Sequence, residues 1–247
     1  MFKKLFSRPS TTPAAPQAAV TGPVPAEPVQ AAVVQRSTVH DLTKKAAHSL
    51  SKFDLTAQRA AVYLVMDRSG SMCKHYDDGT MQYLGEQVLG LSRNLDDDGS
   101  VPVFFFSTGL DGETVVSVDD YAGRIQAAHE AIGHMGRTYY ERGINAAVAH
   151  YRASGATAPA LVVFQSDGRP DNPAAAVEAF QEAEEAMFFA LVGYGDKVDF
   201  MRSLPAQLRN VGFFHAADPA NTSDEELYDG IVSPFRTFLA ARSADAR

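Results

Sequence analysis

An unbroken apolar run that ends on a carboxylate constrains the fold of this chain more than any other feature. The β-branched and aromatic content of Ala61–Met66 favours a strand buried on both faces, as in a parallel sheet under helices. Asp67 follows directly, then Ser69 and Ser71, with Gly70 where the backbone must bend. Ligands of open α/β sheets bind beyond the carboxyl ends of the strands. These oxygens predict a site for a hard cation such as Mg²⁺ or, alternatively, a turn that caps the next helix.

A second segment of this kind lies later in the chain. Leu161–Gly168 is another buried-strand pattern, and it ends on the carboxylate of Asp167 and a glycine. A helical stretch opens near 136 and runs to about 151, which places Thr138 in a loop at the start of that helix. Because the ends of parallel strands meet at one edge of a sheet, we expect two acids and three hydroxyls to converge there.

The order of these segments resembles the von Willebrand factor A (VWA) domain and its metal-ion-dependent adhesion site (MIDAS). The matching phrases are D-x-S-x-S at 67–71, Gly-x-Thr at 136–138 and Ser-Asp-Gly at 166–168. The resemblance implies that hydroxyl oxygens hold Mg²⁺ or Mn²⁺ directly or through water, and that the carboxylates act largely through waters and charge. The metal ligands that it implies are Asp67, Ser69, Ser71, Thr138 and Asp167.

Further phrases are similar to bacterial VWA proteins associated with tellurium resistance (TerF-like) and related stress operons. They are Val62–Met72, Leu95–Gly99, Gly133–Thr138 and Ser223–Tyr228. The resemblance covers about 58–241. It implies a metal-dependent protein-binding module in a bacterial stress-response assembly, whose protein partner offers an Asp or Glu to the metal.

Length and composition predict one α/β domain with a tail. We expect a flexible Pro/Ala-rich tail at 1–36, a short extension packing on the domain at 37–57, the VWA domain at 58–241 and a disordered C-terminus at 242–247. The first eight residues carry apolar and cationic side chains that would contact a membrane weakly. They are too short to span it, and no signal-peptide apolar region follows.

The segments between these landmarks alternate as a doubly wound, mostly parallel sheet flanked by helices requires. Apolar spacing predicts helices over 81–95 and 121–132, and apolar runs predict strands at 101–106, 187–192 and 211–214, with an edge strand at 113–118. Asn172-Pro173 and the capping box Ser223–Glu226 each predict a helix start. Residues 38–60 fit either a partial helical stripe or two short strands at the domain edge.

Composition bears on compartment and partners. The formal net charge of −8 and pI near 5.3 argue against nucleic acid or an anionic membrane as the main partner. Cys73 is the single cysteine, which excludes an intrachain disulfide and suits a reducing compartment, so we expect a cytoplasmic protein. His75 and His134 lack a second histidine or cysteine at ligand spacing, which argues against zinc.

Strand-end acids also build Mg²⁺-dependent hydrolases and phosphotransferases, and this is the alternative function. Phosphatases of the haloacid dehalogenase type need a second aspartate where this chain has Ser69. Neither a G-x-x-x-x-G-K-[ST] phosphate loop nor a G-x-S-x-G elbow occurs. The sequence therefore predicts a protein that is not an enzyme. A VWA scaffold that binds through its surface without metal is a third reading, which the intact motif disfavours.

Overall fold

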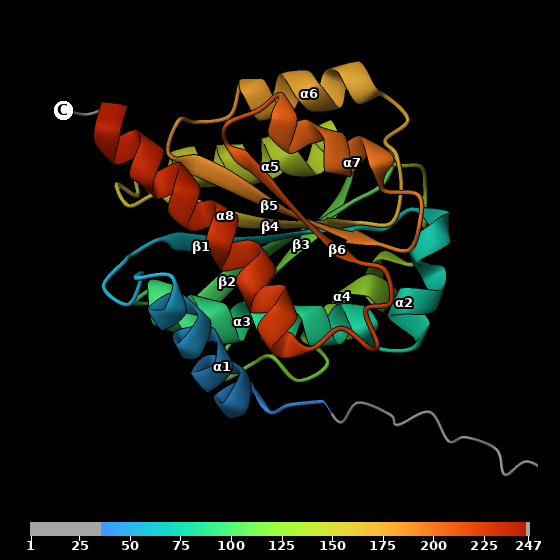
Figure 1. Ribbon diagram of the computed structural model, residues 1–247. Helices are drawn as coiled ribbons and strands as arrows, with labels where there is room; N and C mark the ends of the chain where they lie inside the picture. Colours follow the sequence, from blue (N-terminus) through green and yellow to red (C-terminus); the bar gives the residue numbers. More distant parts are fainter. Residues whose placement is uncertain (1–35, 246–247) are drawn as a thin grey trace, which may run out of the picture. The chain divides into compact units, whose positions relative to one another are not determined.

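A six-stranded sheet lies at the centre of residues 36–245, the part of the chain that the computed structural model describes (Figure 1). Its order is β3-β2-β1-β4-β5-β6, and all neighbouring strands pair in parallel except β2 and β3, which are antiparallel. The strands are β1 (Ala61–Asp67), β2 (Ser100–Phe106), β3 (Leu110–Ser117), β4 (Ala160–Ser166), β5 (Met187–Tyr194) and β6 (Val211–Ala216). The chain winds outward from β1 to one edge and then from β4 to the other, so the topological switch point lies between β1 and β4.

Helices cover both faces of the sheet, as Figure 1 shows. One layer holds α1 (Val39–Lys52), α3 (Thr80–Leu95), α4 (Arg124–Ile132) and α8 (Asp224–Asp245). The other holds α5 (Tyr140–Ser154), α6 (Pro173–Gln181), α7 (Asp199–Ser203) and the 3₁₀ turn η2 (Leu204–Ala206). A second 3₁₀ turn, η1 (Gly70–Met72), and α2 (Cys73–Asp77) follow β1.

The central strands are buried on both faces, as their continuous apolar runs predict. In β1, Leu64 packs into the core on the α3 side, and Val65 packs into the core on the α5 side. The doubly wound α/β fold is thereby confirmed. The edge strand is also confirmed as β3. The capping box is confirmed too, since Ser223 Oγ accepts from Glu226 N at 3.2 Å and Glu226 Oε2 accepts from Ser223 N at 3.0 Å.

Of the two structures that fit 38–60, the chain adopts the helix, α1. Thr38 caps it by accepting a hydrogen bond from the amide of Asp41 at 3.2 Å. Leu42, Ala46 and Leu50 form its buried face. The helix approaches α3 so closely that a Cβ at Gly90 would lie 2.8 Å from the Cβ of Leu42, so glycine makes this packing available.

Both ends of the described part of the chain differ from the predicted boundaries. Arg36, assigned by sequence to the tail, lies over the ring of Tyr83 and donates to the carbonyl of Asp78 at 3.0 Å. The predicted disordered C-terminus begins at 242, yet α8 continues to Asp245. Arg242 explains the extension, because its guanidinium donates to the carbonyl of Glu185 and lies over the ring of Phe238. Residues 1–35 and 246–247, with the predictions made for them, lie outside the described residues.

Among residues 36–245, no helix combines the length and the apolarity that crossing a membrane would require.

Asp224, at the first turn of α8, joins α8 to α1 and α3. The residue is only 6 % exposed, and its carboxylate accepts hydrogen bonds from four side chains between 2.7 and 3.0 Å away. The donors are Ser37, Lys45, Tyr83 and Gln87. Burial acts to raise the pKa of this carboxyl, but the four hydrogen bonds together lower it below its ordinary value of 3.8.

We expect Asp224→Asn to lower the free energy of unfolding by about 2–3 kcal/mol at pH 7, because it leaves buried donors and the Lys45 cation without a charged acceptor. The folded pKa lies below the unfolded value. The contribution is therefore complete above about pH 3.8 and is lost as the pH falls through the folded pKa. Urea unfolding of both proteins at pH 7 and in acid measures this. If the free energies of unfolding of wild type and Asp224→Asn differ as much in acid as at pH 7, the Asp224 carboxylate is not the source of the stabilisation.

Candidate metal centre

Four of the five predicted ligands lie at the switch point between β1 and β4. The two strands are in register with Met66 opposite Gln165, so Asp67 and Ser166 end the strands side by side. Asp167 follows β4 directly, and Ser69 and Ser71 lie in the turn that leads from β1 into α2. The strand ends thus carry two carboxylates and three hydroxyls to one edge of the sheet.

A continuous series of hydrogen bonds links these residues. Asp67 Oδ1 accepts from the amide of Ser69 at 2.6 Å, and Asp67 Oδ2 accepts from Ser166 Oγ at 2.5 Å. The hydroxyls of Ser69 and Ser71 lie 3.2 Å apart, and Ser71 Oγ donates to Asp167 Oδ1 at 2.8 Å. The structure therefore brings Asp67, Ser69, Ser71 and Asp167 together.

Thr138 is linked to this group through backbone contacts of its loop. Gly136 forms a parallel bridge with Ser69: its amide donates to the carbonyl of Arg68 at 3.2 Å and its carbonyl accepts from Gly70 N at 3.1 Å. Glycine favours this close approach, because a Cβ at position 136 would lie 2.6 Å from the hydroxyl oxygens of Ser107 and Thr108 and would force these side chains to move. The loop backbone thus packs directly on the D-x-S-x-S turn.

Asp171 holds Thr138 itself. Asp171 Oδ2 accepts from the amide of Thr138 at 2.8 Å, and the amide of Asp171 donates to the carbonyl of Thr138 at 2.7 Å. This pair of bonds fixes the peptide of Thr138 beside the segment that follows Asp167.

Sequence reasoning missed three residues of this site. Asp171 acts through a partner far away in the sequence, and no local motif marks it. Ser166 stands in the Ser-Asp-Gly phrase, but its hydrogen bond to Asp67 depends on how the two strands pair. Ser107 follows β2; its carbonyl accepts from Tyr139 N at 3.1 Å, and its buried hydroxyl has no hydrogen-bond partner. The sequence does carry one signal for Ser107: it directly follows an apolar strand, as the ligand residues after β1 and β4 do.

The carboxylate of Asp67 is fully buried, and this burial governs the electrostatics of the site. Burial raises the pKa of Asp67 to about 7, against the opposing effect of the hydrogen bonds from Ser166 and Ser69, and the nearby charge of Asp167 adds to the rise. The Arg68 guanidinium points away and pairs with Asp111 at 3.1 Å. A divalent cation beside Asp67 would supply the missing positive charge, so this donor set fits the hard cation that the sequence predicts.

Within residues 36–245 there is no cluster of three or more His, Cys, Asp or Glu side chains suited to a metal. The candidate site therefore consists of two carboxylates with hydroxyls. His75, on α2, packs instead against the ring of Tyr194, with ring centroids 5.2 Å apart.

Comparison with known proteins identifies the family. The model of the vWA-TerF-like family, described as the vWA found in the TerF C terminus, matches residues 59–246. This match covers more than half of the chain, so the chain belongs to the von Willebrand factor A family. Within that family it belongs to the TerF-like group.

Individual proteins are similar to this chain as well. The uncharacterized protein YcbR of Bacillus subtilis is 28% identical over 211 residues, covering 81% of this chain and 86% of that protein. Proximal thread matrix protein 1 from the mussel byssus has a TM-score of 0.51 at 14% identity, over 72% of this chain and 48% of that one. The pilus adhesin SpaC from Lactobacillus rhamnosus GG has a TM-score of 0.50 at 14% identity, over 72% and 30%. This chain spans less than half of either solved structure, and the likeness shows the fold alone.

Asp67→Asn should stabilise the protein in a chelator at pH 8 by at least about 1 kcal/mol, or roughly 2–4 °C in Tm. The folded pKa is raised, so the wild type loses stability as the pH rises from about 4 to about 7. The asparagine carries no charge and removes this loss. Thermal unfolding in EDTA across this pH range tests it. Parallel pH profiles of the two proteins would contradict it.

Asp171→Ala should weaken Mn²⁺ binding about tenfold, because the Thr138 amide loses its acceptor and the loop is no longer fixed. Asp171→Asn is the matched control, since its amide oxygen presents the same acceptor and should retain nearly wild-type affinity. Isothermal titration with Mn²⁺ measures both variants. Equal losses would point to the charge of Asp171 rather than to its hydrogen bond.

Proposed function

We propose that this chain is a metal-dependent protein-binding module, in which Mg²⁺ or Mn²⁺ at the MIDAS positions binds an Asp or Glu of a protein partner. The observation that carries the proposal is the hydrogen-bonded chain from Asp67 through Ser69 and Ser71 to Asp167, which lies at the switch point of the sheet. The residues that would hold the ion are Asp67, Ser69, Ser71, Thr138 and Asp167.

The chemistry of this donor set supports an open ion. Mg²⁺ takes six oxygens and gives up its waters reluctantly. Hydroxyl ligands bring no charge, and carboxylates that act through water neutralise the ion only partly. The bound ion would thus supply a strong local positive charge, to which an external carboxylate is the natural ligand. The overall negative charge of the protein does not oppose this at short range.

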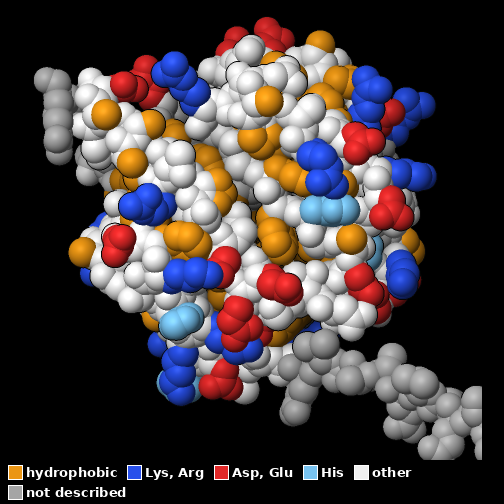
Figure 2. Space-filling model, in the orientation of Figure 1, with side chains coloured by type: hydrophobic (Ala, Val, Ile, Leu, Met, Phe, Trp, Pro, Cys, Tyr) orange, Lys and Arg blue, Asp and Glu red, His pale blue; other side chains and the backbone are white. Residues whose placement is uncertain are grey.

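The surface and the cysteine bear on the class of partner and on the compartment. Figure 2 shows positively and negatively charged side chains interspersed over the face drawn there, which supports a protein partner rather than nucleic acid. Membership of the TerF-like group supports a place in a bacterial tellurium-resistance or stress-response assembly. The single cysteine supports a cytoplasmic location.

The alternative, a Mg²⁺-dependent hydrolase or phosphotransferase, gains no support from the one thiol near the site. Cys73 is exposed on α2, and its hydrogen bond to Asp77 raises the pKa of the thiol, which makes it a poorer nucleophile.

The partner should be captured by wild-type protein in Mg²⁺ and lost both in EDTA and with Asp67→Ala, because the ion forms part of the interface. Pull-down with the immobilised protein, followed by titration of the purified partner, measures this. Changing the contacting Asp or Glu of the partner to its amide should abolish binding while the partner stays folded. Binding that survives EDTA, or phosphoester turnover that disappears in Asp67→Ala, would overturn the proposal.

A further inference from the structure

Arg68, the residue between Asp67 and Ser69, has a fully buried side chain that the metal chemistry does not use. Its Nη1 donates to Asp111 Oδ2 at 3.1 Å, its Nε donates to His129 Nδ1 at 3.1 Å, and its Nη2 donates to the carbonyl of His129 at 3.3 Å. The three nitrogens thus bind groups on β3 and α4. We call Arg68, Asp111 and His129 the arginine cluster.

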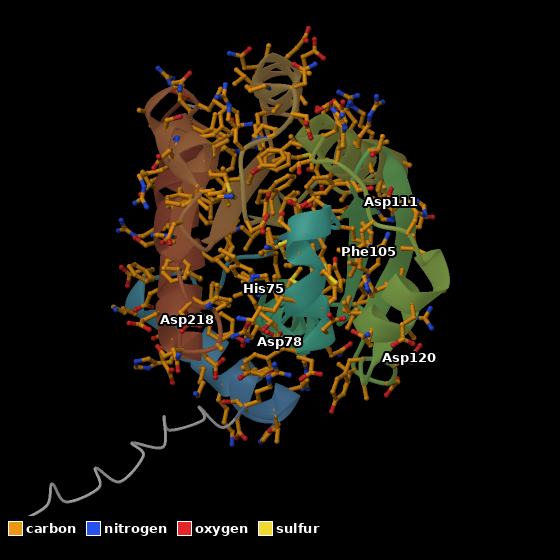
Figure 3. All side chains as sticks on the ribbon, turned by 90° about the vertical axis from the view of Figure 1, so that its right-hand side faces the viewer. His75, Asp78, Phe105, Asp111, Asp120 and Asp218 are labelled. Carbon is orange, nitrogen blue, oxygen red and sulfur yellow. The ribbon has the colours of Figure 1, made fainter. Side chains whose placement is uncertain are left out.

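A β-bulge aims Asp111 at Arg68. In the β2–β3 ladder, Phe105 pairs with Gly112 and Phe106 pairs with Leu110, which leaves Asp111 as an extra residue in β3. Most of β3 lies at the exposed edge of the sheet, yet the side chain of Asp111 is only 4% exposed. Figure 3 labels Asp111 on the green part of the ribbon that contains β3. The bulge therefore supplies the carboxylate that a buried guanidinium needs.

His129 joins the cluster to the end of β1. Its ring stacks on Tyr76 with centroids 4.0 Å apart and an interplanar angle of 10°, and the hydroxyl of Tyr76 donates to the carbonyl of Asp67 at 3.1 Å. Burial and the adjacent Arg68 charge lower the pKa of His129, which agrees with a neutral imidazole that accepts at Nδ1.

The position of the cluster points to the loop that carries Thr138. The Arg68 side chain caps the carbonyl of His129 in the last turn of α4, where Gly133 ends the helix with φ +79°. Three residues later the loop returns, and Gly136 donates to the backbone carbonyl of the same Arg68. One residue therefore holds the helix before the loop by its side chain and holds the loop itself by its main chain.

We propose that the arginine cluster consists of positioning residues that fix the Thr138 loop against the D-x-S-x-S turn, so that the Thr138 hydroxyl reaches the ion only when the cluster is intact. This inference rests on the proposed metal site. A buried ion pair adds little net stability, because the cost of desolvating both charges offsets much of their attraction. Such pairs can instead select one conformation of the segments that they join. The cluster should accordingly act on metal affinity through Thr138 alone.

A double-mutant cycle with Mn²⁺ titration tests this in the full chain. His129→Ala removes the acceptor and should weaken Mn²⁺ binding about tenfold, whereas His129→Asn places an oxygen where Nδ1 was and should stay within about twofold of wild type. Thr138→Ala should cost about tenfold in the wild-type and His129→Asn backgrounds, but less than about twofold in His129→Ala. Ser71→Ala is the matched control, and its cost should be the same in all three backgrounds.

The outcomes separate this inference from the proposed function. If wild type binds Mn²⁺ no better than Asp67→Ala, the metal site fails. If wild type binds and Asp67→Ala does not, but the costs of His129→Ala and Thr138→Ala simply multiply, the positioning role fails. Circular dichroism checks that each variant is folded. Should His129→Ala unfold, His129→Phe takes its place in the same cycle, because it keeps a ring to stack on Tyr76 but offers Arg68 no acceptor. The same non-additivity with Thr138→Ala is expected, and additivity would again overturn the inference.

Discussion

Burying a carboxylate at the end of a central strand is the constraint around which this structure is arranged. Asp67 has lost its water, and two hydrogen bonds only partly replace the hydration, so the pKa stays raised. Asp224 is buried as well, but four donors surround it and lower its pKa. The hydrogen bonds to Asp224 compensate for the loss of hydration on burial, so this carboxylate stabilises the fold in its charged form. The hydrogen bonds to Asp67 do not compensate fully, so its negative charge remains unfavourable. Imbalance of this kind is what an external cation can exploit.

Local patterns made the fold and most of the site predictable from the sequence. The buried strands, the D-x-S-x-S turn and the strand-end Asp167 are contiguous phrases, and parallel-sheet topology brings them together without further information. The ambiguity over 38–60 arose because a partial stripe fits two structures. The cap at Thr38 and the close approach at Gly90 favour the helix, and the second of these depends on tertiary packing.

The supporting residues could not be predicted, because their roles depend on the register of distant segments. Asp171 contacts Thr138 from 33 residues away in the sequence, and Asp111 contacts Arg68 from 43 residues away. The second contact depends on a β-bulge, which the pattern of apolar residues does not predict. Arg68 itself looked like the variable position of a motif. The side chain of Arg68 contacts β3 and α4, and neither element is part of the D-x-S-x-S motif.

The bulge at Asp111 also bears on the exposed edge of the sheet. β3 is an edge strand that carries exposed Leu110 and Val115, a combination that invites pairing with a strand of another molecule. The extra residue interrupts the regular spacing of backbone donors and acceptors along that edge, and it increases the local twist. A straight incoming strand would therefore meet an irregular template at the Asp111 end of β3, so the residue that pairs with a buried arginine also makes strand pairing at that end of the edge less favourable.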